Sequence, residues 1–114
     1  MRDKPIKVAV VGIGGIGGIL TSLFSKNGFE TYAVTSRDSS NMINESGLNV
    51  SSTFFGTFKS HPIATERLDT VVDLIIFATK SPYLRESFNR INPATVGKPL
   101  YLSLLNGLGS RELV

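Results

Sequence analysis

The sequence predicts an α/β fold, in which a mainly parallel, doubly wound sheet carries helices on both faces. Three observations support this prediction. Val8–Val11 is an apolar run that leads into a glycine cluster, and apolar residues at helical spacing follow it. A second apolar run spans Val71–Ala78. Since strands buried on both faces are typical of parallel sheets, this alternation of strands and helices predicts a layered α/β domain.

The glycine cluster has the spacing Gly-x-Gly-x-x-Gly at Gly12, Gly14 and Gly17. Between a strand and a helix, the first glycine permits a tight turn, the second lets a pyrophosphate approach, and the third allows close helix packing. The helix N-terminus then favours an anion. The spacing also occurs in plain turns, kinase loops and methyltransferases, but the flanking strand and helix favour a Rossmann-type nucleotide site. The predicted cofactor-binding turn comprises Gly12, Ile13, Gly14, Gly15, Ile16 and Gly17.

Composition narrows the functional class. The 114 residues are 41% hydrophobic and 18% charged, which fits one globular domain. The net charge of +3 favours an anionic ligand, but the twelve Lys and Arg are scattered, so no nucleic-acid partner is expected. Without cysteine and with a single histidine, His61, which we expect at the surface, no metal site is predicted. No signal peptide or membrane-length apolar stretch occurs, so we expect a cytoplasmic protein.

The first half of the chain predicts a right-handed βαβ unit followed by smaller elements. Its parts are a strand at Ile6–Val11, a helix at Gly15–Asn27 that Gly28 ends, and a strand at Thr31–Thr35. The apolar face of the helix is expected at Ile16, Ile19, Leu20, Leu23 and Phe24. Three further elements are expected: a polar helix at Ser39–Ser46 ended by Gly47, a hairpin or two short strands at Leu48–Ser60, and a strand at Pro62–Thr65.

The second half predicts two more strands, at Val71–Ala78 and Pro99–Leu105. Between them, Ser81 and Pro82 start a helix whose apolar face would comprise Leu84, Phe88 and Ile91, with Pro93 ending it. Ser110 would cap a last helix, of which Val114 completes only the first turn. An isolated turn is unstable, so we expect a truncated chain or an excised domain.

Polar residues follow the predicted strands at their carboxyl ends, where open parallel sheets bind ligands. Ser36-Arg37 lies about twenty residues after the glycine turn, where NAD sites place an acidic residue. A guanidinium there would grip a 2′-phosphate, which favours NADP over NAD. Asp38 would contact a ribose hydroxyl or cap the next helix. Thr79-Lys80 and Asn106 follow the last two strands and would face nicotinamide and substrate; a solvated lysine and an ordinary Asn-Gly turn are the alternatives.

Four motifs in this order resemble those of the ketopantoate reductases (2-dehydropantoate 2-reductases). They are Val8–Gly18, Ser36-Arg37, Ala78-Thr79-Lys80 and Ser103–Gly109. The resemblance implies an N-terminal NADPH-binding domain of an oxidoreductase that reduces a 2-oxo acid, 2-dehydropantoate, to a 2-hydroxy acid, pantoate, in pantothenate biosynthesis. It further implies that Arg37 contacts the 2′-phosphate, and that Lys80 and Asn106 contact the nicotinamide half and the substrate.

The chain also departs from the family pattern. The family commonly has alanine where Gly15 stands, and a small residue and a glutamine-bearing helix where Ser81-Pro82-Tyr83 stands. The family's helical C-terminal domain, which supplies the catalytic lysine, a substrate-binding glutamate and a homodimer surface, is missing from residues 1–114. We therefore assign no catalytic residue here. The alternatives are a non-catalytic NAD(P)-binding regulatory module or remnant, and a reductase of another 2-oxo acid.

Overall fold

The computed structural model describes residues 5–14, 16–53, 56–78 and 84–104. Its main sheet has the strand order β5-β2-β1-β6-β7, and every strand pair in it is parallel. These strands are β1 (Lys7–Val11), β2 (Glu30–Val34), β5 (Ile63–Thr65), β6 (Leu74–Phe77) and β7 (Leu100–Ser103). The helices are α1 (Ile16–Lys26), α2 (Arg37–Ser46) and α3 (Leu84–Asn89), and β3 (Leu48–Ser52) and β4 (Gly56–Ser60) form a separate antiparallel hairpin. The predicted Rossmann-type α/β architecture is confirmed.

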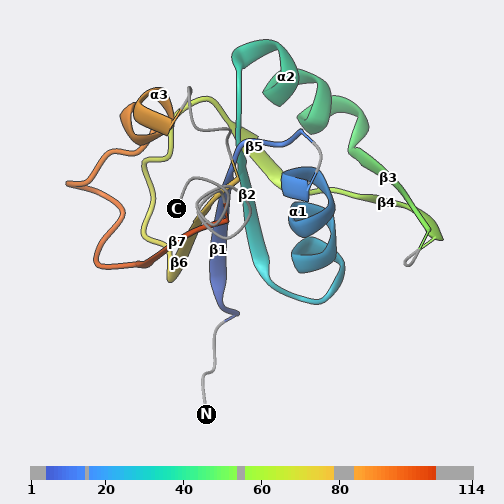
Figure 1. The fold of residues 1–114 in the computed structure, drawn as a ribbon, viewed down its shortest axis with the longest axis horizontal. Helices are drawn as coiled ribbons and strands as arrows, with labels where there is room; N and C mark the ends of the chain where they lie inside the picture. The colour runs from blue at the N-terminus through green and yellow to red at the C-terminus, as the bar shows by residue number, and fades with distance from the viewer. Residues whose placement is uncertain (1–4, 15, 54–55, 79–83, 105–114) are drawn as a thin grey trace, which may run out of the picture.

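Strand β1 is the centre of the core, because both of its faces are covered. Val8 and Val10 pack with Leu20 and Phe24 of α1 on one face. Ala9 and Val11 point to the opposite face, which carries α3. Figure 1 shows α1 and α3 on opposite sides of the sheet. This burial on both faces is why the strand reads as continuous apolar sequence rather than as an alternating pattern.

The sheet reverses its winding direction between β1 and β6. From β1 the chain proceeds outward through β2 to β5, then returns to the other side of β1 for β6 and β7. In open α/β sheets, this switch point opens a crevice at the carboxyl ends of the strands. Gly12 follows β1 and Ala78 follows β6, so the glycine turn lies at the switch point.

Helix α1 packs Leu20 and Phe24 of its predicted face against the sheet, but it also buries residues outside that face. Ile16 is 48% exposed, whereas Gly17, Gly18, Thr21 and Ser22 are buried. The apolar pattern does not mark Ser22, because the β3–β4 hairpin covers α1 from outside the sheet, as Figure 1 shows. The hydroxyl of Ser60 on β4 donates to that of Ser22 at 3.0 Å. Small and hydroxyl-bearing residues thus line an interface that a hydrophobicity pattern does not reveal.

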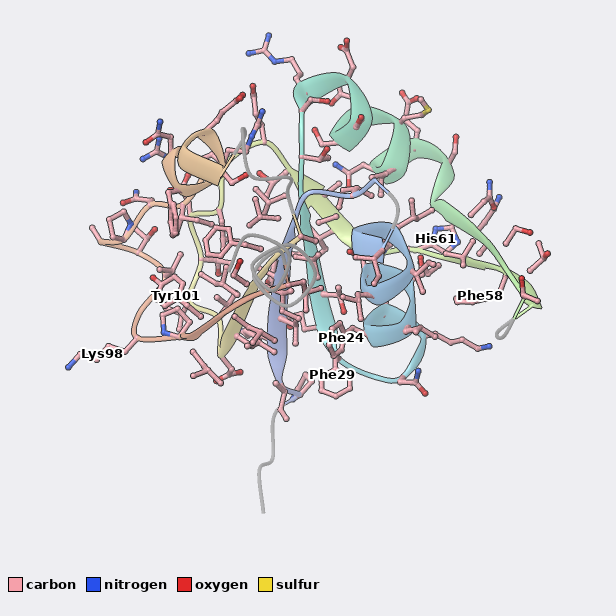
Figure 2. The ribbon with its side chains drawn as sticks, viewed as in Figure 1. Phe24, Phe29, Phe58, His61, Lys98 and Tyr101 are labelled. Atoms are coloured by element: carbon pink, nitrogen blue, oxygen red, sulfur yellow. The ribbon has the colours of Figure 1, made fainter. Side chains whose placement is uncertain are left out.

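The hairpin also contacts the end of α1. Lys26 Nζ lies 4.5 Å from the centre of the Phe58 ring, which is within range of a cation–π interaction. Phe58 is half-buried on β4, as the expected edge packing requires, while Phe54 and Phe55 lie outside the described residues. His61, directly after β4, is exposed as predicted (Figure 2).

Other boundaries differ modestly from the predictions. Strand β6 begins at Leu74, and Val71 is 58% exposed. Helix α3 ends at Asn89, so Ile91 is not part of its face: Ile91 is buried and forms a parallel bridge with Leu68. Phe88 stays on α3, 51% exposed, against the ring of Phe77. The predicted caps at Ser81 and Ser110 lie outside the described residues. No helix in the described ranges is long and apolar enough to cross a bilayer.

Edge strand β5 is completed by a side chain rather than by another strand. Asn44 of α2 donates from Nδ2 to the carbonyl of Ala64 at 2.9 Å, and its Oδ1 accepts from the Ala64 N–H at 2.9 Å. Ala64 is buried, so without Asn44 its N–H and C=O groups would lack hydrogen-bond partners at this edge of the sheet. The asparagine therefore satisfies a donor and an acceptor at once.

We expect Asn44→Asp to lower the free energy of unfolding by about 1–3 kcal/mol, because a carboxylate cannot donate to the Ala64 carbonyl. Chemical denaturation of the variant and of the wild type measures this difference. Asn41→Asp on the same helix, an exposed position, is the matched control. Equal stability of Asn44→Asp and wild type would contradict the bridging role.

Candidate functional site

The three motif glycines have three distinct geometries. Gly12 has a φ of 95°, a left-handed conformation that favours glycine and turns the chain out of β1. A Cβ at Gly17 would lie 2.0 Å from the carbonyl oxygen of Gly12, so α1 approaches the turn too closely for any side chain. A Cβ at Gly14 would meet nothing within 4 Å. The turn is thus closed on the Gly17 side and open at Gly14, as a phosphate-binding turn requires.

The non-glycine positions of the turn serve different purposes. The Ile13 side chain packs under α2, against the cluster that contains Ala33 and Ile43. Ile16 begins α1 with its side chain half exposed. The side chain of Ile13 is therefore taken up by packing, which leaves its backbone to face a nucleotide. Gly15, also predicted for this turn, lies outside the described residues.

A cavity of about 220 Å³ opens beside the turn, above the carboxyl ends of β1 and β2 and against α3. It is smaller than the roughly 300–1,000 Å³ of pockets that enclose whole ligands, so it has room for one part of a dinucleotide. The lining residues are Val11, Gly12, Val34, Thr35, Ser36, Glu86, Ser87 and Arg90.

Ser36 and Arg37 lie at the N-terminus of α2, which starts two residues earlier than predicted. Ser36 is the N-cap, and its hydroxyl accepts from the Ser39 N–H at 3.3 Å. Asp38 lies in the first turn and is not the cap, so that alternative for Asp38 is wrong. The Arg37 side chain is 77% exposed and lies beside the carboxylate of Glu66, with 3.5 Å between Nε and Oε1. The N-terminus of α2 therefore borders the cavity through Ser36, and the guanidinium of Arg37 follows it directly in the chain.

Arg90, directly after α3, joins the segments that follow β2 and β5. Its Nη1 donates to the carbonyl of Thr35 at 3.0 Å and to that of Glu66 at 3.1 Å. Its Nη2 lies 3.6 Å from Oε1 of Glu86. Neither Arg90 nor Glu66 is among the site residues predicted from the sequence. Glu66 could have been found, because it follows the predicted strand Pro62–Thr65 at its carboxyl end; no sequence signal marks Arg90.

Three predicted site residues lie outside the described part of the chain. They are Thr79, Lys80 and Asn106. The strands that precede them, β6 and β7, pair in parallel beside β1, so their carboxyl ends are at the same edge of the sheet as the glycine turn. The predicted roles of these residues stay predictions.

Comparison with known proteins places this geometry in a family. The model of the ketopantoate reductase PanE/ApbA family matches residues 8–114. The chain belongs to the ketopantoate reductase family. A search of the curated proteins found no match.

Solved structures show the same fold, and two of them carry the names ketopantoate reductase and 2-dehydropantoate 2-reductase. A PanE/ApbA family ketopantoate reductase from Ralstonia eutropha JMP134 is 22% identical, with a TM-score of 0.73, over 90% of this chain and 38% of that one. A protein from Enterococcus faecalis assigned as a 2-dehydropantoate 2-reductase is 27% identical, with a TM-score of 0.74, over 95% and 36%. D-mandelate dehydrogenase in a ternary structure with NADH and anilino(oxo)acetate is 24% identical, with a TM-score of 0.76, over 95% and 36%. The chain thus spans about a third of the length of these structures.

Proposed function

We propose that this chain is the NADPH-binding domain of an oxidoreductase that reduces 2-dehydropantoate to pantoate. The observation that carries the proposal is the glycine turn, open at Gly14 and closed at Gly17, next to a cavity lined by Ser36, the residue before Arg37. Bound there, the cofactor would supply a hydride to the carbonyl carbon of the 2-oxo acid, and a proton would complete the hydroxyl group. Membership of the ketopantoate reductase family supports this class of reaction.

Each part of the cofactor has a place in this arrangement. The pyrophosphate would lie over Gly14 at the N-terminus of α1, where the helix dipole favours negative charge. The adenosine would enter the cavity against α3. The 2′-phosphate would meet Arg37 and the N-terminus of α2. Lys80 and Asn106 would face the nicotinamide and the substrate, as the family resemblance implies.

We propose that residues 1–114 carry only part of this activity. In the solved relatives the matching region is about a third of the chain. We propose that a helical C-terminal domain supplies the catalytic lysine, part of the substrate site and the dimer contact. On their own, residues 1–114 would then bind the nucleotide but catalyse little turnover of substrate.

Titration with NADPH and NADH, followed by the fluorescence of the reduced nicotinamide, tests the cofactor site. We expect Arg37→Ala to weaken NADPH binding by about tenfold and NADH binding much less, because charge-assisted hydrogen bonds contribute roughly 1.5–3 kcal/mol and solvent screens this exposed side chain. Lys98→Ala is the matched control, since it removes one positive charge near the amino end of β7 (Figure 2). No binding by the wild type, or equal losses for both cofactors, would contradict the proposal.

A second candidate is a reductase of another 2-oxo acid. The likeness to D-mandelate dehydrogenase, whose structure contains NADH and anilino(oxo)acetate, favours testing it. Assay of the complete enzyme with a panel of 2-oxo acids distinguishes the two candidates. A preference for 2-dehydropantoate supports the first, and a preference for an aromatic 2-oxo acid supports the second.

A further inference from the structure

We propose that Glu66 determines cofactor specificity by opposing the binding of a 2′-phosphate at Arg37. The inference rests on the proposed nucleotide site. The Glu66 carboxylate lies 3.5 Å from Nε of Arg37, the guanidinium that the 2′-phosphate would contact. Glu66 thus lies against one edge of the guanidinium that would recognise the 2′-phosphate of NADPH.

The fold holds this pair in place through its backbone. Strands β2 and β5 are neighbours, and the Thr35 N–H donates to the Thr65 carbonyl at 2.9 Å just beyond their ladder. Arg90 then bonds both the Thr35 and Glu66 carbonyls. The two chain segments that carry Arg37 and Glu66 are therefore tied together on both sides. The proximity of the two side chains follows from sheet pairing and not only from their own attraction.

The charges around Arg37 bear on the choice of cofactor. A phosphate monoester carries a charge of about −1.5 to −2 near pH 7. A 2′-phosphate at Arg37 would have to share the guanidinium with the Glu66 carboxylate and would be repelled by it. The 2′-hydroxyl of NADH carries no charge, and a carboxylate is the group that accepts its hydrogen bond in NAD sites. Glu66 thus disfavours NADPH and tolerates NADH.

Two other arginines whose side chains the structure describes near this edge of the sheet do not relieve the competition. Arg90 Nη2 faces Glu86 at 3.6 Å, and Arg67 Nε faces Asp69 at 3.8 Å. Each of these guanidinium groups already lies beside a carboxylate. Removing the charge of Glu66 alone should therefore change the electrostatics at Arg37 selectively.

The experiment compares wild type, Glu66→Gln and Glu45→Gln by titration with NADPH, NADH and the fragment 2′-AMP. Glu45, an exposed residue in the last turn of α2, is the matched control for charge. We expect Glu66→Gln to tighten NADPH and 2′-AMP binding about fivefold, since an exposed ion pair contributes up to about that factor. NADH affinity should change less than twofold, and Glu45→Gln should match the wild type. The gain should shrink at high salt.

Two results separate this inference from the proposed function. If Arg37→Ala weakens NADPH selectively while Glu66→Gln leaves the ratio of NADPH to NADH affinity unchanged, the nucleotide site stands and the role of Glu66 is wrong. If the wild type binds neither cofactor nor 2′-AMP, both fail. When Arg37→Ala is also present, the effect of Glu66→Gln on NADPH affinity should fall by more than half, because Glu66 acts mainly by competing for the Arg37 guanidinium. An undiminished effect in this double variant would overturn the inference.

Discussion

Replacing Gly17 with alanine will strongly destabilise the domain. The added Cβ would lie 2.0 Å from the Gly12 carbonyl oxygen and 3.1 Å from the Cβ of Ala78. The first neighbour is backbone within the turn, so it cannot move aside as the end of a side chain could. Helix α1 would have to shift away from β1 and lose the contacts of Leu20 and Phe24. We expect a loss of about 3 kcal/mol or more, at the upper end of the cost of overpacking.

Chemical denaturation monitored by circular dichroism measures this loss. Gly14→Ala is the matched control, because its Cβ meets nothing within 4 Å. If Gly17→Ala folds with the stability of the wild type, α1 does not approach the turn as closely as described. Loss of stability in both variants would indicate instead that the whole turn tolerates no side chain.

The second large effect is expected for Gly14→Ala, and it concerns the binding of the cofactor. Gly14→Ala should fold with a free energy of unfolding within about 1 kcal/mol of the wild type, because its φ lies outside the left-handed range and the space is open. That open space is where the proposed pyrophosphate approaches the backbone. A methyl group there should weaken NADPH and NADH alike by about tenfold to a hundredfold, which corresponds to the 1–3 kcal/mol cost of a steric intrusion.

Fluorescence titration of the folded Gly14→Ala variant checks this expectation. Its effect should differ in kind from that of Arg37→Ala, which acts on NADPH alone. Unchanged affinity of Gly14→Ala for both cofactors would place the pyrophosphate elsewhere and contradict the proposed site.

The sequence was sufficient to predict the sheet and the turn because their determinants are local. Val8–Val11 is buried on both faces, and Gly12 and Gly17 each meet a steric requirement imposed within the turn itself. The face of α1 that the hairpin covers could not be predicted in the same way. Ser22 is buried only because Ser60, 38 residues later, packs against it. Two hydroxyl groups that satisfy each other give no hydrophobic pattern.

The residues of the candidate site could likewise be predicted only in part. Arg37 could be singled out because its distance from the glycine turn is set by the length of one helix and one strand. Arg90 lies far along the chain, at the end of α3, and reaches the site through two backbone carbonyls. Neither its spacing nor its surroundings in the sequence mark it. Contacts between a long side chain and distant main-chain oxygens depend on tertiary structure alone.

The hairpin over α1 has a consequence for how the domain responds to ligand. Because β3 and β4 cover the helix that begins at the glycine turn, opening of the hairpin would expose α1. A nucleotide held at the turn would stabilise the closed form of this whole region. Slowed amide hydrogen exchange would then extend from the turn into β4, a strand that the nucleotide never touches.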